Sequence, residues 1–259
     1  MYRNGRMEAL PDLPYPISAA SLTVYKGFVS LCGGYRLGSQ ISKDCLQLNI
    51  FNTFASWKKI VRLPIEMYAH SSVQVLDKMW FFSDYNIYVV TQTGRATVIK
   101  WPRAYGTVPK YSCAQSNGVI TVVIPDRSRH VYINKVASSP GSWAILATLP
   151  TGLHRRSCLM MGSLFYVTGG WNGATYSKET YEIYIENFGS VERVGDLLTA
   201  RYSHSMGVIE GEPAVFGGDG GKCLDDTEIL DTNTQKWRAG SVKMAMPSGD
   251  IASVSFPVN

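Results

Sequence analysis

The feature that most constrains this chain is a short apolar run that ends in two glycines and recurs along the sequence. Residues 165–170 read FYVTGG, residues 214–218 read AVFGG, and residues 31–34 read LCGG. The three resulting glycine pairs are Gly33-Gly34, Gly169-Gly170 and Gly217-Gly218. Their spacings are multiples of a period of roughly 45 residues, which is typical of a chain built from structural repeats. We therefore expect the same folding unit to recur along most of the protein.

Other markers follow the same period. Three tryptophans stand near the ends of repeats, at Trp57, Trp143 and Trp237, and they are separated by about two repeat lengths each. His70 and His204 are each followed by Ser in similar lead-in segments, about three repeat lengths apart. This agreement between independent markers makes chance an unsatisfactory explanation of the period.

Within each repeat, apolar and polar residues alternate with period two, as in residues 180–185 (TYEIYI), and Gly, Asn and Asp fill the connections. No segment carries an apolar stripe of helix length. The expected repeats cover residues 15–64, 65–108, 109–150, 151–199 and 200–247. Four short antiparallel strands per repeat, occurring about five times, predict an all-β fold, a β-propeller of five to six four-stranded blades.

The two ends of the chain resemble parts of a repeat. Residues 7–14 (MEALPDLP) resemble the fourth-strand phrases, and residues 248–259 resemble the lead-in to a first strand. We expect residues 1–14 and 248–259 to form a composite, partial blade, so that the terminal strands pair and close a single domain over residues 1–259. Such closure would protect exposed sheet edges.

The recurring residues have physical roles in such a fold. A glycine tolerates both a close backbone neighbour and a positive φ, so each glycine pair is expected to mark a crowded position. The tryptophan near the fourth strand is expected to supply a large apolar plate that packs between blades.

Composition limits the function classes. Hydrophobic residues make up 45% of the 259-residue chain, charged residues 17% and aromatic residues 12%. These values are typical of an ordered globular protein rather than a disordered one. The net charge is +5 and the basic residues are scattered, so no nucleic-acid or membrane-binding patch is expected. The charge favours an acidic partner mildly.

The cysteines carry no metal or redox signature. There are five, and none forms a CxxC or Cys/His pattern, so we expect them to be buried free thiols: Cys32, Cys45, Cys113, Cys158 and Cys223. The N-terminal residues lack the apolar core of a secretory signal, and no stretch approaches a membrane span. Together these observations predict a cytoplasmic protein.

Candidate catalytic chemistry is sparse. The only four histidines are His70, His130, His154 and His204, and none has Cys, Asp or Glu at ligand spacing in the sequence. The run at residues 217–222 (GGDGGK) lies between strands, without the helix N-terminus that a phosphate-binding loop uses. Asp225, Asp226 and Glu228 are interpreted as a solvated turn. We expect no catalytic residue, no metal and no cofactor.

The glycine pair, the aromatic-rich third strand with Tyr181 and Tyr184, the spaced tryptophans and the lead-in RYSH at residues 201–204 resemble kelch repeats. The resemblance covers nearly the whole chain and is weaker in the second and third repeats, which lack the glycines. It implies a non-enzymatic protein-binding propeller, similar to those of kelch-like proteins that recognise ubiquitin-ligase substrates or bind actin. No BTB or BACK region is recognisable. The alternative is a propeller enzyme of the oxidase or sugar-epimerase type, acting on a small molecule at a central pocket.

The resemblance also implies where a partner binds. In kelch propellers the binding rim is built from the loop after the glycine pair and the loop that leads into the first strand. Exposed Tyr, Trp and Arg are enriched at binding hot spots. The corresponding residues here are Tyr35, Arg36, Tyr68, Tyr85, Arg127, Arg155, Arg156, Trp171, Asn172, Arg201, Tyr202 and Asp219. This assignment predicts that replacing Arg155, Arg156 and Arg201 with Glu abolishes partner capture without lowering thermal stability.

Overall fold

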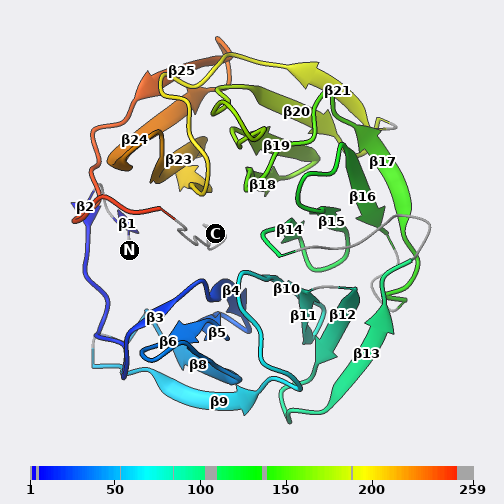
Figure 1. The fold of residues 1–259 in the computed structure, drawn as a ribbon, viewed down its shortest axis with the longest axis vertical. Helices are drawn as coiled ribbons and strands as arrows, with labels where there is room; N and C mark the ends of the chain where they lie inside the picture. The colour runs from blue at the N-terminus through cyan, green and yellow to red at the C-terminus, as the bar shows by residue number, and fades with distance from the viewer. Residues whose placement is uncertain are drawn as a thin grey trace. The chain divides into compact units, whose positions relative to one another are not determined.

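The computed structural model describes residues 2–3, 6–52, 54–83, 85–102, 110–135, 139–187 and 189–249, and the regular elements of these ranges are all β-strands (Figure 1). The described part of the chain contains no helix long and apolar enough to cross a membrane. The chain divides into two compact units. Unit 1 comprises the described residues of Met1–Ala9, Asp126–Tyr132 and Ile145–Ser253, and unit 2 those of Leu10–Pro125, Ile133–Ala144 and Val254–Asn259.

Five four-stranded sheets fall within the five repeats expected from the sequence. The first has the order β4-β5-β8-β9, with bounds Ser21–Tyr25, Phe28–Cys32, Asp44–Leu48 and Lys58–Arg62. The second is β10-β11-β12-β13, with bounds Ser71–Val75, Lys78–Ser83, Asn86–Val90 and Ala96–Lys100. The third is β14-β15-β16-β17, with bounds Cys113–Ser116, Thr121–Ile124, His130–Asn134 and Ala144–Thr148.

The last two sheets belong to unit 1. The fourth sheet is β18-β19-β20-β21, with bounds Ser157–Met161, Leu164–Thr168, Thr180–Tyr184 and Ser190–Arg193. The fifth is β22-β23-β24-β25, with bounds Ser205–Ile209, Glu212–Asp219, Cys223–Asp231 and Lys236–Ala239. In these two sheets, strands that follow one another in the chain are neighbours and antiparallel, and in the first sheet β6 and β7 are inserted between the paired strands β5 and β8. The meander of four strands predicted for each repeat is therefore confirmed.

Two smaller sheets complete the described structure. In unit 2, β3 (Ile17–Ser18), β6 (Tyr35–Arg36) and β7 (Gln40–Ile41) form a short sheet in the order β3-β6-β7. In unit 1, β1 (Tyr2–Arg3) pairs with β2 (Arg6–Met7). Residues 8–16 form no strand, so the fourth strand expected over residues 7–14 is limited to the end of β2. The C-terminal half of the predicted closure, residues 250–259, lies outside the described residues.

The first strands of consecutive sheets lie against one another within each unit: β4 and β14 both contact β10 in unit 2, and β18 contacts β22 in unit 1. The middle strands are buried on both faces, as in β11, where only Lys78 of KMWFFS is exposed. Such burial indicates sheets covered on both sides, which is how blades pack face to face. Apolar clusters between sheets hold each unit together, for example the one that joins Tyr166, Met206 and Trp237.

Two of the three recurring tryptophans are buried as the sequence predicts, whereas Trp57 is only half-buried and its indole Nε1 donates to Pro11 O at 2.9 Å. Trp143 is buried against Phe82 of the preceding repeat and Trp101, with ring centroids 5.9 and 4.9 Å away. Trp237 is buried as well, and its indole Nε1 donates to Thr180 Oγ1 of the preceding repeat at 2.9 Å. A large aromatic side chain therefore bridges adjacent sheets in both units.

The glycine pairs mark close approaches between consecutive repeats. Gly33 has φ of 68°, and a Cβ there would lie 2.5 Å from Met67 O and 2.6 Å from His70 Cε1. Gly169 has φ of 58°, and a Cβ there would lie 2.6 Å from His204 Cε1. Both the positive φ and the lack of space exclude a side chain, so these glycines are structural.

His70 and His204 are structural in the same way. His70 Nε2 is 2.8 Å from Ser21 Oγ, and His204 Nε2 is 2.7 Å from Thr168 Oγ1, so each ring reaches back to the preceding repeat. Burial lowers the pKa of His70 to about 3, and burial together with the charge of Arg201 lowers the pKa of His204 to about 3. Both imidazoles are therefore neutral near pH 7.

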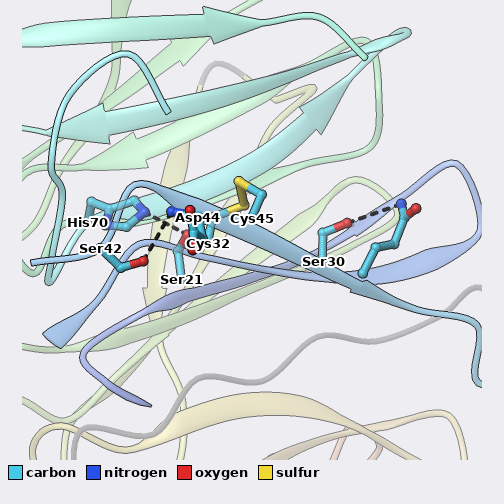
Figure 2. Close-up of a disulfide and its surroundings, with 8 residues drawn as sticks. Ser21, Ser30, Cys32, Ser42, Asp44, Cys45 and His70 are labelled. Atoms are coloured by element: carbon cyan, nitrogen blue, oxygen red, sulfur yellow. Dashed lines mark hydrogen bonds between the residues drawn. A yellow bond between two sulfur atoms is a disulfide. The ribbon is translucent and has the colours of Figure 1, made fainter. Parts of the chain in front are cut away.

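The expectation of free thiols is wrong for most of the cysteines. Cys32 of β5 and Cys45 of β8 are register partners with Cα atoms 4.1 Å apart, and they form a disulfide (Figure 2). Cys113 and Cys158 are also disulfide-bonded, and Cys223, which is exposed, is the free cysteine among the described residues. Spacing along the chain gave no sign of the first pair because cross-strand register, not sequence motif, brings these thiols together.

Candidate functional site

In unit 2, three of the predicted binding residues form an aromatic and cationic cluster. The rings of Tyr35 and Tyr68 are 4.3 Å apart between centroids. The guanidinium of Arg36 lies 3.7 Å from the ring centroid of Tyr15, and the ammonium of Lys110 lies 3.6 Å from that of Tyr68. Cations this close to ring faces are held by the aromatic quadrupole. The short strand β6 places Tyr35 and Arg36 immediately after the glycine pair.

The phenols of this cluster have raised pKa values. The hydrogen bond with Tyr68, followed by burial, raises the pKa of Tyr35 to about 12. Burial and the charge of Asp44 raise the pKa of Tyr15 above its ordinary value. Both hydroxyls therefore stay protonated near pH 7, and that of Tyr15 donates to the Asp44 carboxylate.

A polar cleft of about 280 Å³ adjoins Arg36 in the same unit. Lys43, Lys59 and Arg62 also line it, with Asp44 at its wall. The Asp44 carboxylate accepts from Lys59 Nζ at 2.6 Å, lies 3.6 Å from Arg62 Nε and accepts from Tyr15 Oη at 3.3 Å. Burial alone would raise the pKa of Asp44, but the hydrogen bond and charge of Lys59, with Tyr15 and Arg62, lower it below its usual value.

In unit 1, a second cluster is mainly aromatic. Tyr176 and Tyr202 are stacked, with ring centroids 5.2 Å apart and an interplanar angle of 5°. Trp171 lies 6.1 Å from Tyr202, and the His154 ring lies 6.1 Å from Trp171. The four rings come from the loop before β18, the loop after β19 and the loop before β22. The two kinds of loop predicted for the rim are therefore brought together here, and we call these four residues the aromatic cluster.

Backbone bridges position the aromatic cluster. His154 and Trp171 exchange backbone hydrogen bonds, and Trp171 also forms a bridge with Tyr176. Tyr202 exchanges backbone hydrogen bonds with Asp219. These contacts hold the loops in an ordered arrangement, which lowers the entropic cost of binding a ligand.

A carboxylate supports one end of the cluster. Asp126 follows β15, and its carboxylate is hydrogen-bonded to His154 Nδ1 and accepts from the Arg155 backbone N–H at 2.8 Å. The Arg155 guanidinium donates to Ser203 Oγ at 3.1 Å, beside Tyr202. Arg127 points outward, with 72% of its side chain exposed and its Nε 3.8 Å from Asp126. Arg155 and Arg127 remain candidates for partner contact.

Two of the predicted arginines are buried, which corrects their assignment. Arg201 is 0% exposed, and its guanidinium donates to Gly217 O at 2.7 Å, to both carboxylate oxygens of Asp226 and to Glu228 Oε1 at 2.5 Å. Glu228 is buried as well and also accepts from two backbone N–H groups. The solvated turn expected at this position is therefore wrong for Glu228, and Arg201 is an internal ion-pair residue.

Arg156 is the other buried arginine. It is 7% exposed, donates to Thr151 O at 2.6 Å, and burial lowers its pKa to about 10. The prediction that a triple Arg-to-Glu variant keeps its stability does not hold, because two of the three changes would place a carboxylate in the interior.

The remaining predicted residues lie at the surface. Tyr85 is 64% exposed at the β11–β12 connection of unit 2. Asn172 is exposed, and its amide oxygen accepts from the backbone N–H groups of Ala174 and Thr175, which fixes the loop after Trp171. Asp219 accepts from Gly221 N at 2.7 Å at the end of β23.

Sequence reasoning missed five residues of these clusters and their surroundings. Tyr176 lies too far beyond the glycine pair to be selected as part of its loop, Tyr15 stands at the very start of the first expected repeat, and His154 was considered only as a possible metal ligand. Asp126 and Lys110 lie in the third repeat, where the glycines are absent and the register is weakest. Over the described ranges, no group of three or more His, Cys, Asp or Glu side chains is arranged to hold a metal ion.

Comparison with known proteins supports the fold. No protein-family model matches the sequence, and no curated protein matches it. Among solved structures, the protein YjhT is similar over 87% of this chain and 84% of its own, with a TM-score of 0.72 and 15% sequence identity. YjhT has a β-propeller-like fold. The five meander sheets and this similarity show that the chain is an all-β protein with the β-propeller fold.

Proposed function

We propose that this protein is a non-enzymatic interaction module that binds a protein or peptide ligand through the aromatic cluster of unit 1. The observation that carries the proposal is the pair of stacked rings of Tyr176 and Tyr202, with the tilted ring of Trp171 beside them, on ordered loops. Aromatic side chains of this kind combine large contact area with few rotatable bonds, and they dominate binding hot spots. Tyr176 is 37% exposed, so the outer end of the stack is open to a ligand.

Charged groups around the cluster suggest how a ligand would be oriented. Asp219 adjoins Tyr202, the guanidinium of the half-buried Arg155 reaches Ser203 beside the same tyrosine, and the exposed Arg127 lies beside Asp126. A peptide lying across the rings would therefore meet both an acidic group and basic groups. Polar groups around an apolar centre give specificity and register rather than most of the affinity.

The test is a selection of peptide ligands by display, followed by calorimetric Kd measurements on single variants. We expect Trp171→Ala and Tyr176→Ala each to weaken binding by at least about 30-fold, as for hot-spot residues. Phe54→Ala is the control, because Phe54 is 95% exposed in the β8–β9 connection and belongs to neither cluster. Unchanged binding by both cluster variants, or equal weakening by Phe54→Ala, would refute the proposal.

The kelch resemblance supplies two finer proposals: substrate recognition for a ubiquitin ligase and binding to actin. Cosedimentation with filamentous actin, compared between the wild-type protein and Trp171→Ala, tests the second. Loss of sedimentation in the variant supports an actin role, and no sedimentation of the wild type excludes it. Ligase function requires, in addition, that the selected ligand be ubiquitinated in a manner that depends on Trp171.

We also propose the cytoplasmic location that the sequence predicts. The part of that prediction that relied on free cysteine thiols fails, because Cys32 and Cys45 form a disulfide and disulfides are uncommon in reducing compartments. Thiol labelling of the protein as it exists in its native cells tests the proposal. Labelling of Cys32 before added reductant supports the cytoplasm, and labelling only after reduction contradicts it.

A further inference from the structure

The polar cleft of unit 2 is lined by more cationic than anionic side chains. Arg36 of β6, Lys43 before β8, and Lys59 and Arg62 of β9 line it, against two carboxylates, Asp44 and Glu66. We call these four cationic residues the basic cleft. Because four cationic side chains face only two carboxylates, the net charge of the cleft is positive and attracts an anion.

The carboxylate at the wall fixes the cations rather than neutralising the cleft. Asp44 contacts Lys59 and Arg62 at once, at 2.6 and 3.6 Å, while its own side chain is only 10% exposed. One carboxylate therefore holds two cationic side chains in place, and their combined charge exceeds its own. Glu66 is exposed and lies at the margin, in the connection after β9.

The other two cations are not paired with carboxylates. Within the described residues, no Asp or Glu lies in ion-pair distance of Arg36 or Lys43. Arg36 is instead positioned by its 3.7 Å stacking on the Tyr15 ring. Stacking occupies the face of a guanidinium and leaves its edge N–H groups for an oxyanion. Arg36 thus meets the requirement for bidentate recognition before any ligand arrives.

We propose that the basic cleft binds a phosphoryl group carried by a side chain of a protein partner. A phosphoryl group presents three acceptor oxygens and close to two negative charges, which suits cations converging from three separate elements. A carboxylate offers only two oxygens and one charge. The inference rests on the proposed function in one respect, namely that the partner is a protein; the site itself is separate from the aromatic cluster.

The test uses small probes and amide NMR spectra of the full chain. Pentapeptides Gly-Gly-X-Gly-Gly are titrated with X as phosphoserine, Ser or Glu, together with inorganic phosphate. We expect the phosphoserine peptide to shift the amide resonances of residues 36–44 and 59–62 and to bind at least about tenfold more tightly than the Glu peptide. The Ser peptide should cause no shift.

Matched variants locate the effect. Arg36→Gln and Lys43→Gln should each weaken phosphoserine-peptide binding by at least about fivefold, the loss of a charge-assisted hydrogen bond. Lys58→Gln removes the same charge from β9 but lies outside the cleft, and it should change affinity less than about twofold. If Arg36→Gln fails to fold, as shown by its thermal unfolding, Lys43→Gln carries the same test.

Four outcomes would overturn the proposal. These are no shift at the cleft, equal binding of the Glu and phosphoserine peptides, equal weakening by Lys58→Gln and Lys43→Gln, and binding of inorganic phosphate without binding of the phosphoserine peptide. Trp171→Ala should leave the phosphoserine titration unchanged. The failure of this proposal and the failure of the aromatic-cluster proposal are therefore distinguishable.

Discussion

Arg36 in unit 2 and Arg201 in unit 1 begin from similar sequence contexts and end in opposite environments. Each is next to a tyrosine in a segment predicted to form the binding rim. Arg36 is half-exposed and stacked on Tyr15, whereas Arg201 is 0% exposed and paired with Asp226 and Glu228. For these two arginines, the difference in burial follows the carboxylates that a neighbouring strand supplies. β24 does so for Arg201, and no described carboxylate pairs with Arg36.

The largest expected effect separates these two arginines directly. Arg201→Gln leaves Glu228 buried without its cation, and breaking a buried pair in this way costs ~3–5 kcal/mol of unfolding free energy. Arg36→Gln removes an exposed cation–π contact and should cost less than about 1 kcal/mol. Urea unfolding of both variants makes the measurement. Similar losses of unfolding free energy for the two variants would contradict the internal ion pairing of Arg201.

The buried histidines give the next effect, which depends on pH. The pKa of His70 and of His204 is about 3 in the folded protein, against 6.5 as the ordinary value. The unfolded chain therefore binds protons that the folded protein does not, and stability is lost as pH falls from about 6.5 toward 3. In that window each histidine lowers the free energy of unfolding by up to about 1.4 kcal/mol for each unit that the pH falls.

Thermal unfolding between pH 7 and pH 5 measures this slope, above the range in which most carboxylates titrate. His204→Gln should retain a neutral hydrogen-bonding group and flatten the slope by about half. The same result is expected for His70→Gln, because the arrangement recurs in both units. An unchanged slope in both variants would show that these rings do not stay neutral when folded.

A smaller loss of stability is expected from a substitution at Gly169, which lies against the backbone of Arg201. Gly169→Ala places a methyl group 2.6 Å from the His204 ring, whereas Gly162, with φ of 60°, has open space around it. Both substitutions carry the cost of a positive φ, so their difference isolates the steric term. We expect Gly169→Ala to lose about 1–3 kcal/mol more than Gly162→Ala, measured by urea unfolding. Equal losses would contradict the close approach between repeats.

The smallest effect is expected at Arg127. Its side chain is 72% exposed and its nearest carboxylate, that of Asp126, is 3.8 Å away. Exposed pairs of this kind contribute little, so Arg127→Gln should change stability by less than about 0.5 kcal/mol. A loss comparable to that of Arg201→Gln in the same unfolding assay would place Arg127 with the internal arginines.

The sequence predicted the regular part of the fold because the relevant signals are local or periodic. Alternation within strands, the glycine pairs at Gly33 and Gly169, and the tryptophans at Trp143 and Trp237 each have a direct structural counterpart. The Cys32–Cys45 disulfide was missed because it depends on the register between β5 and β8. The strand expected over residues 7–14 was also misjudged, since residues 8–16 form none and a short phrase that resembles a strand does not by itself provide a pairing partner.

The candidate site was predicted less well, for a related reason. The repeat register located the loops that carry Trp171 and Tyr202, but it gave no information on which side chains turn inward. Arg201 and Arg156 were assigned to the rim from their positions in lead-in loops of the repeat, while the carboxylate that holds Arg201, that of Glu228, lies 27 positions away on another strand. Tyr176 joins the stack through a loop whose conformation depends on Asn172.

The central claim is that the aromatic cluster, rather than the internal arginines, receives the protein ligand. Hydrogen-exchange mass spectrometry of the protein, with and without a display-selected peptide, tests it most directly. We predict new protection confined to residues 171–177, 202–203 and 154–155, with exchange around Arg201 and Arg156 already slow before the peptide is added. Protection confined to other loops, or slow exchange at residues 171–177 in the free protein with no change on binding, would contradict the claim.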